Sequence, residues 1–292
     1  MTVAPIRAGG SPVAPDAATN ADDPMNSVLG KARTILEAFD TETAELSLTE
    51  LVRRTGVAKA SVYRLAQELT EWGLLERSGT RYHLGLRLFE LGQLVPRQRI
   101  LRNAALPYME DLLMATQETV HFAVREGLDV LYIEKIIGHR GLSEQSRVAG
   151  RLPLHSTATG KVILAFSSPK LFDDVVRHGF TALTRHTTMS VALLRKQVDR
   201  VRAERLAVER EEVRLGYLST AVPVFGGRGM LAGALSITGP TTRLSVARVS
   251  GALRTAAAGI SRTLQAMSCV DGLGEADCCP PALCPMPRCH LH

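Results

Sequence analysis

Cysteine is missing from most of this 292-residue chain. No disulfide can therefore hold residues 1–268 together, and that part of the chain must be stabilised by packing. The cysteines stand near the end, at Cys269, Cys278, Cys279, Cys284 and Cys289. With two nearby histidines they could bind a soft metal, but their spacing matches no common zinc module and prolines separate them. We therefore expect a disordered tail over residues 269–292 and no metal site.

Long hydrophobic runs are also absent. No apolar stretch approaches the roughly 20 residues that span a bilayer, and the first residues lack the apolar core of a signal peptide. Residues 1–25 are rich in Ala, Pro, Gly and Asp without any period, so we expect a disordered leader there. The chain as a whole is 45% hydrophobic and 22% charged, which is typical of a globular protein, and its length allows about two domains. We expect a cytoplasmic protein with no membrane partner.

Common enzyme signatures are missing as well. Gly160-Lys161 lacks the upstream glycine and the following hydroxyl residue of a phosphate-binding loop. Gly227-Arg228-Gly229 stands between two predicted strands and is better explained as a hairpin turn than as a dinucleotide site. His155-Ser156 has no nucleophile elbow around it, and the histidines have no metal-ligand spacing. The sequence thus predicts neither an enzyme nor a bound cofactor.

The clearest positive pattern is a helix, a tight turn and a second helix over residues 46–69. Gly56 stands at the turn, where it can adopt the positive φ of a sharp corner. The second helix repeats apolar residues at the i, i+3, i+4, i+7 spacing, at Val62, Leu65, Ala66 and Leu69. Its other faces carry polar residues, which are Lys59, Ser61, Tyr63 and Arg64. Such side chains near a helix N-terminus are what a recognition helix presents to the major groove of DNA, although a solvated helical hairpin in a larger core would look similar.

A β-hairpin follows these helices directly. Residues 74–77 and 81–84 have strand character, with a glycine turn between them. A hairpin in this position is a wing, and Arg77 and Arg81 beside its tip are placed to contact phosphates or the minor groove. From residue 51 to residue 82, six basic residues stand against three acidic ones, in a chain of net charge +6. With an amphipathic helix at residues 28–39, these features predict a winged helix-turn-helix domain for double-stranded DNA over residues 26–85.

A linker helix is predicted over residues 86–103, with a kink or break at Pro96. It contains more apolar residues than a lone solvated helix would expose, namely Leu86, Leu88, Phe89, Leu91, Leu94 and Val95. We expect these residues to pack on a partner helix, most simply the same helix of a second subunit. Packing on the helix's own domain is the alternative.

Residues 104–268 are predicted to form a mixed domain. The expected strands come in pairs, at residues 119–124, 130–135, 218–225 and 231–238. The expected helices lie between and around them, at residues 109–116, 157–166, 193–204 and 244–267. Paired strands with intervening helices indicate an antiparallel sheet flanked by helices, and hence an α+β fold.

The order of several motifs resembles the IclR family of bacterial transcriptional regulators. The matching pieces are Ser47–Leu51 leading into Lys59–Leu65 as one group, and then Gly150–Lys161, Glu211-Glu212 with Gly216, Ala221–Val224 and Ala234–Pro240. Five such groups in the family's order make chance an unconvincing explanation. The resemblance extends over about residues 26–267.

This resemblance implies an N-terminal winged helix-turn-helix domain and a C-terminal effector-binding domain of GAF-like fold. It also implies dimers, often dimers of dimers, on palindromic operators, with repression as the more frequent mode. The family's effector pocket would correspond here to Ala158, Thr159, Glu209, Ser219, Ser236 and Thr238. Many members have Cys at position 219 and Asp at position 209, so the ligand need not be the small keto acid of the best-known relatives.

The residues of this predicted pocket also indicate a chemistry. The helix start at residues 157–160 offers N–H groups and the positive end of a dipole to a carboxylate, although Ser156 or Thr157 could simply cap the helix. The strand hydroxyls would orient a small polar ligand, or else bond to the backbone. We therefore hypothesise a ligand-responsive repressor that senses a small organic acid or a related metabolite. The alternatives are a small-molecule enzyme or sensor that uses the helix-turn-helix only as a scaffold, and a protein-interaction adaptor.

Overall fold

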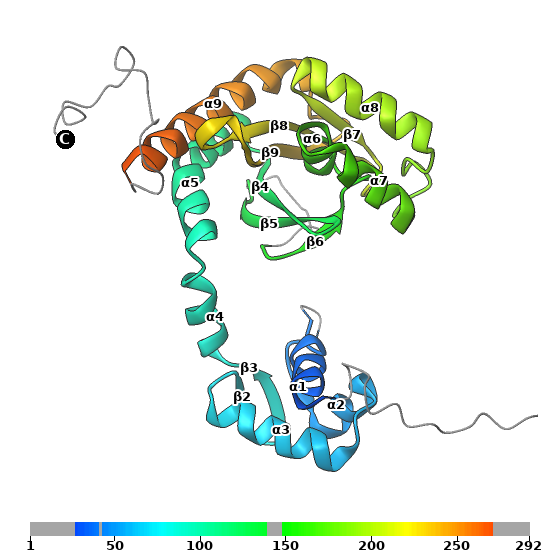
Figure 1. The fold of residues 1–292 in the computed structure, drawn as a ribbon, viewed down its shortest axis with the longest axis vertical. Helices are drawn as coiled ribbons and strands as arrows, with labels where there is room; N and C mark the ends of the chain where they lie inside the picture. Colours follow the sequence, from blue (N-terminus) through cyan, green and yellow to red (C-terminus); the bar gives the residue numbers. More distant parts are fainter. Residues whose placement is uncertain (1–26, 41–42, 139–147, 271–292) are drawn as a thin grey trace, which may run out of the picture. The chain divides into compact units, whose positions relative to one another are not determined.

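The computed structural model describes residues 27–40, 43–138 and 148–270 (Figure 1). Contacts within the chain divide it into two compact units between Val95 and Pro96. The predicted leader lies outside the described residues, and so does the predicted tail, except for Cys269 and Val270 at the end of the last helix. Among the described residues, no helix combines the length and the apolar composition that a membrane crossing requires.

The first unit combines helices with a small antiparallel sheet. Its elements are α1 (Val28–Glu37), β1 (Leu46–Ser47), α2 (Leu48–Thr55), α3 (Lys59–Glu71), β2 (Leu75–Ser78), β3 (Arg81–Leu84) and α4 (Leu86–Gln93). The strands are ordered β1-β3-β2, and β2 and β3 form the predicted wing. The apolar residues of α3 are buried against α1, α2 and the sheet, so the predicted spacing does mark the inner face of this helix.

Helix α2 begins two residues later than the pattern predicted, because Leu46 and Ser47 form a short strand beside β3. Ser47 caps the helix: its hydroxyl accepts the N–H of Glu50 (3.3 Å), and the Glu50 carboxylate accepts the N–H of Ser47 (2.8 Å). The helix ends at Gly56, whose φ of 67° is positive. A capping box and a left-handed glycine thus define both ends of the helix that precedes α3.

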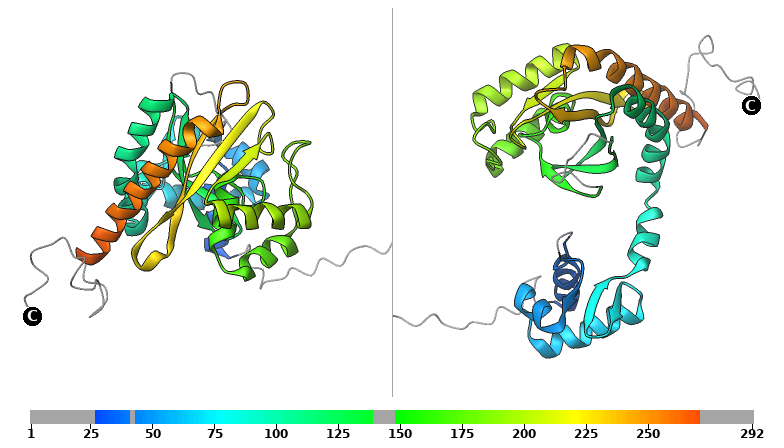
Figure 2. Two further views of the ribbon diagram at one scale, coloured as in Figure 1. Left: turned by 90° about the horizontal axis from the view of Figure 1, so that it is seen from above. Right: turned by 180° about the vertical axis from the view of Figure 1, so that it is seen from behind.

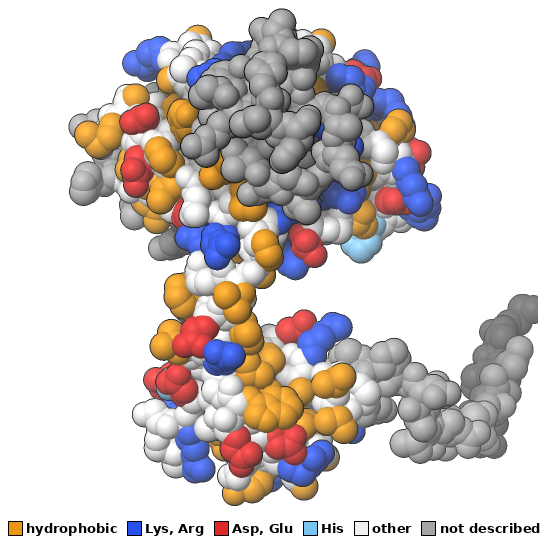
Figure 3. Space-filling model, turned by 60° about the vertical axis from the view of Figure 1, so that its left-hand side comes forward, with side chains coloured by type: hydrophobic (Ala, Val, Ile, Leu, Met, Phe, Trp, Pro, Cys, Tyr) orange, Lys and Arg blue, Asp and Glu red, His pale blue; other side chains and the backbone are white. Residues whose placement is uncertain are grey.

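The linker helix predicted over residues 86–103 is broken before Pro96, where the sequence predicts a kink or break, and its second part continues beyond residue 103. Helix α4 ends at Gln93, and a separate helix, α5 (Pro96–Thr116), begins at Pro96. Proline suits the first position of a helix because its missing N–H would have no partner there. Helix α4 buries none of its side chains, and the apolar surface of the first unit is visible in Figure 3. The most exposed apolar residues of this segment are Leu86, Phe89 and Leu94.

The second unit is built on a six-stranded antiparallel sheet in the order β6-β5-β4-β9-β8-β7. Its strands are β4 (Thr119–Glu126), β5 (Asp129–Ile136), β6 (Arg151–Pro153), β7 (Ala207–Arg210), β8 (Tyr217–Phe225) and β9 (Leu231–Pro240). Besides α5, its helices are α6 (Ala158–Phe166), α7 (Pro169–His178), α8 (Val191–Glu204) and α9 (Val246–Val270). The predicted α+β fold, an antiparallel sheet with flanking helices, is confirmed.

The helices cover both faces of this sheet (Figure 2). Helices α5 and α9 pack on one face, and α6, α7 and α8 pack on the other. Strand β9 serves both cores because its side chains alternate: Leu235 and Ile237 join the first core, and Ala234 joins the second. Ser236 and Thr238 share the face of Ala234, so they point toward the layer that contains α6.

Candidate nucleic-acid interface and small-molecule pocket

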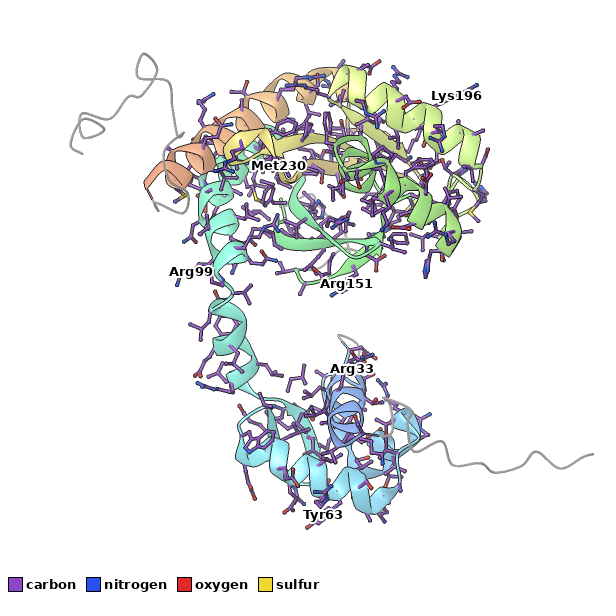
Figure 4. All side chains as sticks on the ribbon, in the orientation of Figure 1. Arg33, Tyr63, Arg99, Arg151, Lys196 and Met230 are labelled. Carbon is purple, nitrogen blue, oxygen red and sulfur yellow. The ribbon has the colours of Figure 1, made fainter. Side chains whose placement is uncertain are left out.

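The exposed face of α3 carries the four polar residues that the sequence singled out. Lys59 and Arg64 are exposed, Ser61 is half-buried, and Tyr63 is 48% exposed. Figure 4 shows Tyr63 pointing away from the rest of the first unit. At the start of this helix Ala58 supplies no side-chain cap. The first-turn N–H groups are therefore available to an acceptor such as a DNA phosphate.

The basic side chains of the first unit differ in how firmly they are held. Arg64 makes one surface ion pair with Glu68 on the next turn (2.8 Å), and such a pair restrains it only weakly. Arg54, by contrast, reaches the Ala38 carbonyl (2.8 Å) and the Asp40 carboxylate (2.9 Å), so it joins two segments of the unit. Arg64 is therefore free to reorient toward a ligand, whereas Arg54 has a structural role.

The two wing arginines also have different surroundings. Arg77 is exposed, and its Nε donates to the Gly79 carbonyl at the turn (2.9 Å). Arg81 donates to the Glu45 carbonyl (2.9 Å) and lies 3.5 Å from the carboxylates of Glu45 and Glu50. These two acids offset the charge of Arg81 within the domain. Of the two predicted wing contacts, Arg77 is the better placed for phosphate, and both assignments stay predictions.

All six residues predicted for an effector pocket line one pocket of the second unit. It lies between the start of α6 and strands β4, β5, β7, β8 and β9, with a free volume of about 40 Å³. Its full lining is His121, Tyr132, Leu152, Thr157, Ala158, Thr159, Glu209, Val213, Arg214, Tyr217, Ser219, Ser236 and Thr238. The structure thus brings the six predicted residues together, although the first and the last of them, Ala158 and Thr238, are 80 positions apart in the sequence. Their role in binding an effector stays a prediction.

Strand register explains why these polar side chains meet. Glu209 lies opposite Ser219 on the β7–β8 pair, and Ser219 lies opposite Thr238 on the β8–β9 pair. The three residues therefore form one row across neighbouring strands. The hydroxyls of Ser219 and Thr238 are 2.9 Å apart and hydrogen-bonded. Ser236 precedes Thr238 by two positions on β9, so its side chain lies on the same face of the sheet as that of Thr238. It lies opposite His121 of β4.

The start of α6 forms the other wall. Thr157 caps the helix, since its hydroxyl accepts the N–H of Gly160 (2.9 Å), so capping is the observed role of this hydroxyl. Ala158 and Thr159 follow and line the pocket. N–H groups in the first turn of a helix have no acceptor within that helix, and the dipole is positive there. This wall therefore suits a carboxylate.

Glu209 provides a hydrogen-bond acceptor, whereas the start of α6 provides N–H donors. Its side chain is buried, and its Oε1 accepts the N–H groups of Glu212 (2.5 Å) and Val213 (3.1 Å). Burial raises the pKa of Glu209 to about 7, and these hydrogen bonds together with one from Ser219 oppose that rise. A buried carboxyl with this pKa can accept a hydrogen bond from a ligand hydroxyl above neutral pH.

His121 and Tyr132 line the same pocket and were missed in the sequence. Their rings are 5.1 Å apart. Burial, with a smaller effect from the charge of Lys135, lowers the pKa of His121 to about 3. Burial also raises the pKa of Tyr132 to about 12. Both side chains are therefore neutral near pH 7. The only signal for them in the sequence was the alternation of residues along the two predicted strands, which places each of them on one face of the sheet.

Charged groups of the pocket are few. Besides Glu209, the lining contains Arg214, which is half-buried with its guanidinium 4.5 Å from the ring centre of Tyr217. Within residues 27–40, 43–138 and 148–270, no group of three or more His, Cys, Asp or Glu side chains is arranged to hold a metal ion. The polar groups that this pocket offers are hydroxyls, ring groups, one carboxyl and one guanidinium, all of which can form hydrogen bonds.

Replacing Glu209 by glutamine is expected to change how the stability of the second unit depends on pH. The pKa of about 7 lies above the ordinary value of 4.5, so the folded protein keeps a proton that the unfolded chain releases between these values. The contribution of Glu209 to stability is complete below pH 4.5 and is lost as the pH rises through 7, by up to about 3 kcal/mol. The unfolding temperature of the Glu209→Gln variant, measured relative to that of the wild type, should therefore increase from pH 5 to pH 8. Parallel curves would show that this carboxyl titrates normally.

A winged helix-turn-helix unit followed by a unit with a pocket that contains several polar side chains is the arrangement of a ligand-responsive DNA-binding protein. A family model described as "Bacterial transcriptional regulator IclR C-terminal" matches residues 93–262, and a model of the "IclR helix-turn-helix domain" matches residues 28–79. The chain belongs to the IclR family of bacterial transcriptional regulators. It is a DNA-binding transcriptional regulator with an effector-binding domain, which confirms the family, the fold class and the general function that the sequence predicted.

Individual relatives agree with this assignment. The chain is 36% identical over 226 residues to the HTH-type transcriptional regulator KdgR of Dickeya chrysanthemi, a match that covers 76% of this chain and 73% of the relative. It is 28% identical over 247 residues to the regulator XynR of Escherichia coli, covering 82% and 98%. Among solved structures, an IclR homolog of Microbacterium hydrocarbonoxydans complexed with 4-hydroxybenzoate matches with a TM-score of 0.78 and 28% identity, covering 82% of this chain and 100% of that one.

Proposed function

We propose that this regulator represses transcription in the cytoplasm by binding a palindromic operator, and that a small hydroxylated carboxylic acid changes its affinity for that operator. The observation that carries the ligand class is the polarity of the pocket. A helix N-terminus on one side suits a carboxylate, and buried Glu209 on another side suits a hydroxyl donor. The 4-hydroxybenzoate bound by the Microbacterium relative has both of these groups.

We further propose that the regulator acts as a dimer or as a pair of dimers. The exposed apolar residues of α4 and of Leu94 directly after it support this, because Leu86 and Phe89 are each 63% exposed and Leu94 is 67% exposed. A second copy of the same segment would cover them. Two recognition helices would then reach half-sites about one turn of DNA apart, on the order of 34 Å. The effector can change operator affinity only by binding the two arrangements of such a dimer with different affinities.

Binding of 4-hydroxybenzoate and benzoate to the purified protein at pH 8, measured by calorimetry, tests the ligand class. The hydroxyl is expected to improve affinity about 10- to 100-fold, because it donates a hydrogen bond to the ionised carboxylate of Glu209, whereas benzoate would displace water from this carboxylate without replacing that bond. The Glu209→Gln variant should lose most of this discrimination. Equal affinities of the wild type for the two acids would overturn the proposed class.

The response to the ligand is tested with the DNA that lies upstream of the protein's own coding region. Fluorescence anisotropy should show that 4-hydroxybenzoate raises the Kd of the protein for this DNA. Saturating DNA should raise the Kd for 4-hydroxybenzoate by the same factor, because the coupling between two binding sites is reciprocal. Protection of two symmetric half-sites in a footprint is expected from the dimer. A single protected half-site at saturating protein would contradict it.

A further inference from the structure

Two short motifs noted in the sequence do not line the pocket, namely Gly160-Lys161 and Glu211-Glu212. They meet inside the second unit, where Lys161 Nζ donates to Glu212 Oε1. The pair is almost fully enclosed, with the Lys161 side chain 1% exposed and the Glu212 side chain 7% exposed. Neither residue lines the pocket, but each lies within three residues along the chain of residues that do, namely Ala158 and Thr159 for Lys161, and Glu209 and Val213 for Glu212.

Stability alone does not account for two buried charges at this place. Removing an ammonium and a carboxylate from water is costly, and their attraction roughly offsets that cost only when the geometry is good. An apolar pair of similar size would often stabilise the fold equally well. What an ion pair adds is a fixed distance and direction between the two segments that carry it.

Glu212 links three segments at once. Its second carboxylate oxygen accepts the N–H of Thr188 (3.1 Å), which lies in the segment before α8. Its carbonyl accepts the hydroxyl of Thr187 (2.7 Å). Its own N–H donates to Glu209 Oε1 (2.5 Å). Through the ion pair with Lys161, the connection between β7 and β8 is therefore tied both to α6 and to residues 187–188.

These links reach both walls of the pocket. Glu209, Val213 and Arg214 belong to the strand and connection that Glu212 holds, and all three line the pocket. On the other side, Lys161 belongs to the helix whose first residues, Ala158 and Thr159, line the opposite wall. The Lys161–Glu212 ion pair is therefore a direct polar link between the α6 wall and the segment that carries Glu209, in addition to the apolar packing of α6 on the sheet.

We infer that Lys161 and Glu212 are positioning residues of the effector pocket, which hold the start of α6 and the 209–214 segment at the separation that a ligand requires. The inference builds on the proposed function, since it assigns how that pocket is kept in its binding geometry. Neither residue lines the pocket. Their loss should therefore alter ligand binding through the order of the pocket walls.

The test uses the full chain with both charges removed at similar volume, as Lys161→Met with Glu212→Gln. Hydrogen exchange of the Glu212 and Val213 amides, measured without ligand, is expected to accelerate by at least about tenfold, because these N–H groups bond to Glu209. Affinity for 4-hydroxybenzoate is expected to fall on the order of tenfold. Thr187→Val, which removes the hydroxyl that donates to the main-chain carbonyl of Glu212, should shift both readouts in the same direction by less.

Leu253→Ala is the matched control, since Leu253 is fully buried on the opposite face of the sheet. It should lower the unfolding temperature at least as much as the double variant does, yet leave the exchange of the Glu212 and Val213 amides and the ligand affinity within about threefold of the wild type. Wild-type exchange at these amides in the double variant would overturn the inference. If the wild type itself fails to bind 4-hydroxybenzoate, the proposed ligand class fails, and the exchange experiment still decides whether the ion pair orders this wall.

Discussion

Replacing Arg64 by alanine is expected to weaken operator binding by about 1–3 kcal/mol, or roughly 5- to 150-fold in Kd. Arg64 lies in the N-terminal half of α3 on its exposed face, and its side chain is 60% exposed. Its only ion pair among the described residues, with Glu68, is of the surface type that contributes little and exchanges readily for a stronger partner. A guanidinium in this position can bond to two acceptors of a guanine edge or to a phosphate. Fluorescence anisotropy with the upstream DNA at several salt concentrations measures the loss.

The salt series also shows which contact Arg64 makes. A phosphate contact should reduce the slope of log K against log salt by about 1 and weaken all DNA sequences alike, whereas a base contact should relax specificity at one position. Arg177→Ala is the control, because Arg177 forms a similar surface pair with Asp174 (2.6 Å) on α7 of the other unit. It removes the same charge and should leave the Kd unchanged. Equal affinities of the Arg64 variant and this control would mean that α3 does not face the DNA.

Replacing Gly160 by alanine is expected to destabilise the second unit by about 1–3 kcal/mol and to abolish ligand binding. A Cβ at this position would lie 2.2 Å from the Leu154 carbonyl oxygen and 2.6 Å from the Leu154 Cα. These are backbone atoms of the segment that enters α6, so no side chain can turn aside to make room. The helix start would have to move away, and with it the wall formed by Ala158 and Thr159. Thermal unfolding and calorimetric titration with 4-hydroxybenzoate measure the two effects.

Gly251→Ala provides a comparison with the same chemical change. Gly251 is exposed within α9, and a Cβ there would meet no atom within 4 Å. Alanine is the better helix former by roughly 1 kcal/mol, so this variant should be slightly more stable than the wild type. DNA binding by the first unit should survive both substitutions. If the two variants unfold at the same temperature, the close approach of Leu154 to Gly160 is not what shapes this wall.

Most helices and strands of the first unit could be predicted from the sequence, because the patterns that define them involve residues close together in the chain. The spacing of Val62, Leu65 and Leu69 predicts the buried face of α3, and Gly56 predicts the turn before it. The strand of Leu46 and Ser47 was not predicted, since two residues carry no periodicity and their pairing with β3 depends on a chain segment 34 positions away. The short strands β6 and β7 escaped prediction for the same reason.

The pocket was predictable only in part. Its six predicted residues came from the family resemblance, and the structure places all of them on one cavity. His121 and Tyr132 were missed because a buried strand residue looks the same in the sequence whether it faces a packed core or a cavity. The roles of Gly160-Lys161 and Glu211-Glu212 were also out of reach, since their contact spans 51 positions and depends on how α6 packs against the β7–β8 connection.

The amino-acid sequence by itself determined the helical spacing, the caps, the glycine turn and the family of this protein, because each depends on residues close together in the chain or on motifs in a fixed order. The tertiary structure alone decided which polar side chains share the cavity, which arginines are offset by carboxylates, and which charges are buried together. Those properties depend on strand register and on exclusion of water. Neither can be derived from neighbours in the sequence, because both arise only when distant segments pack.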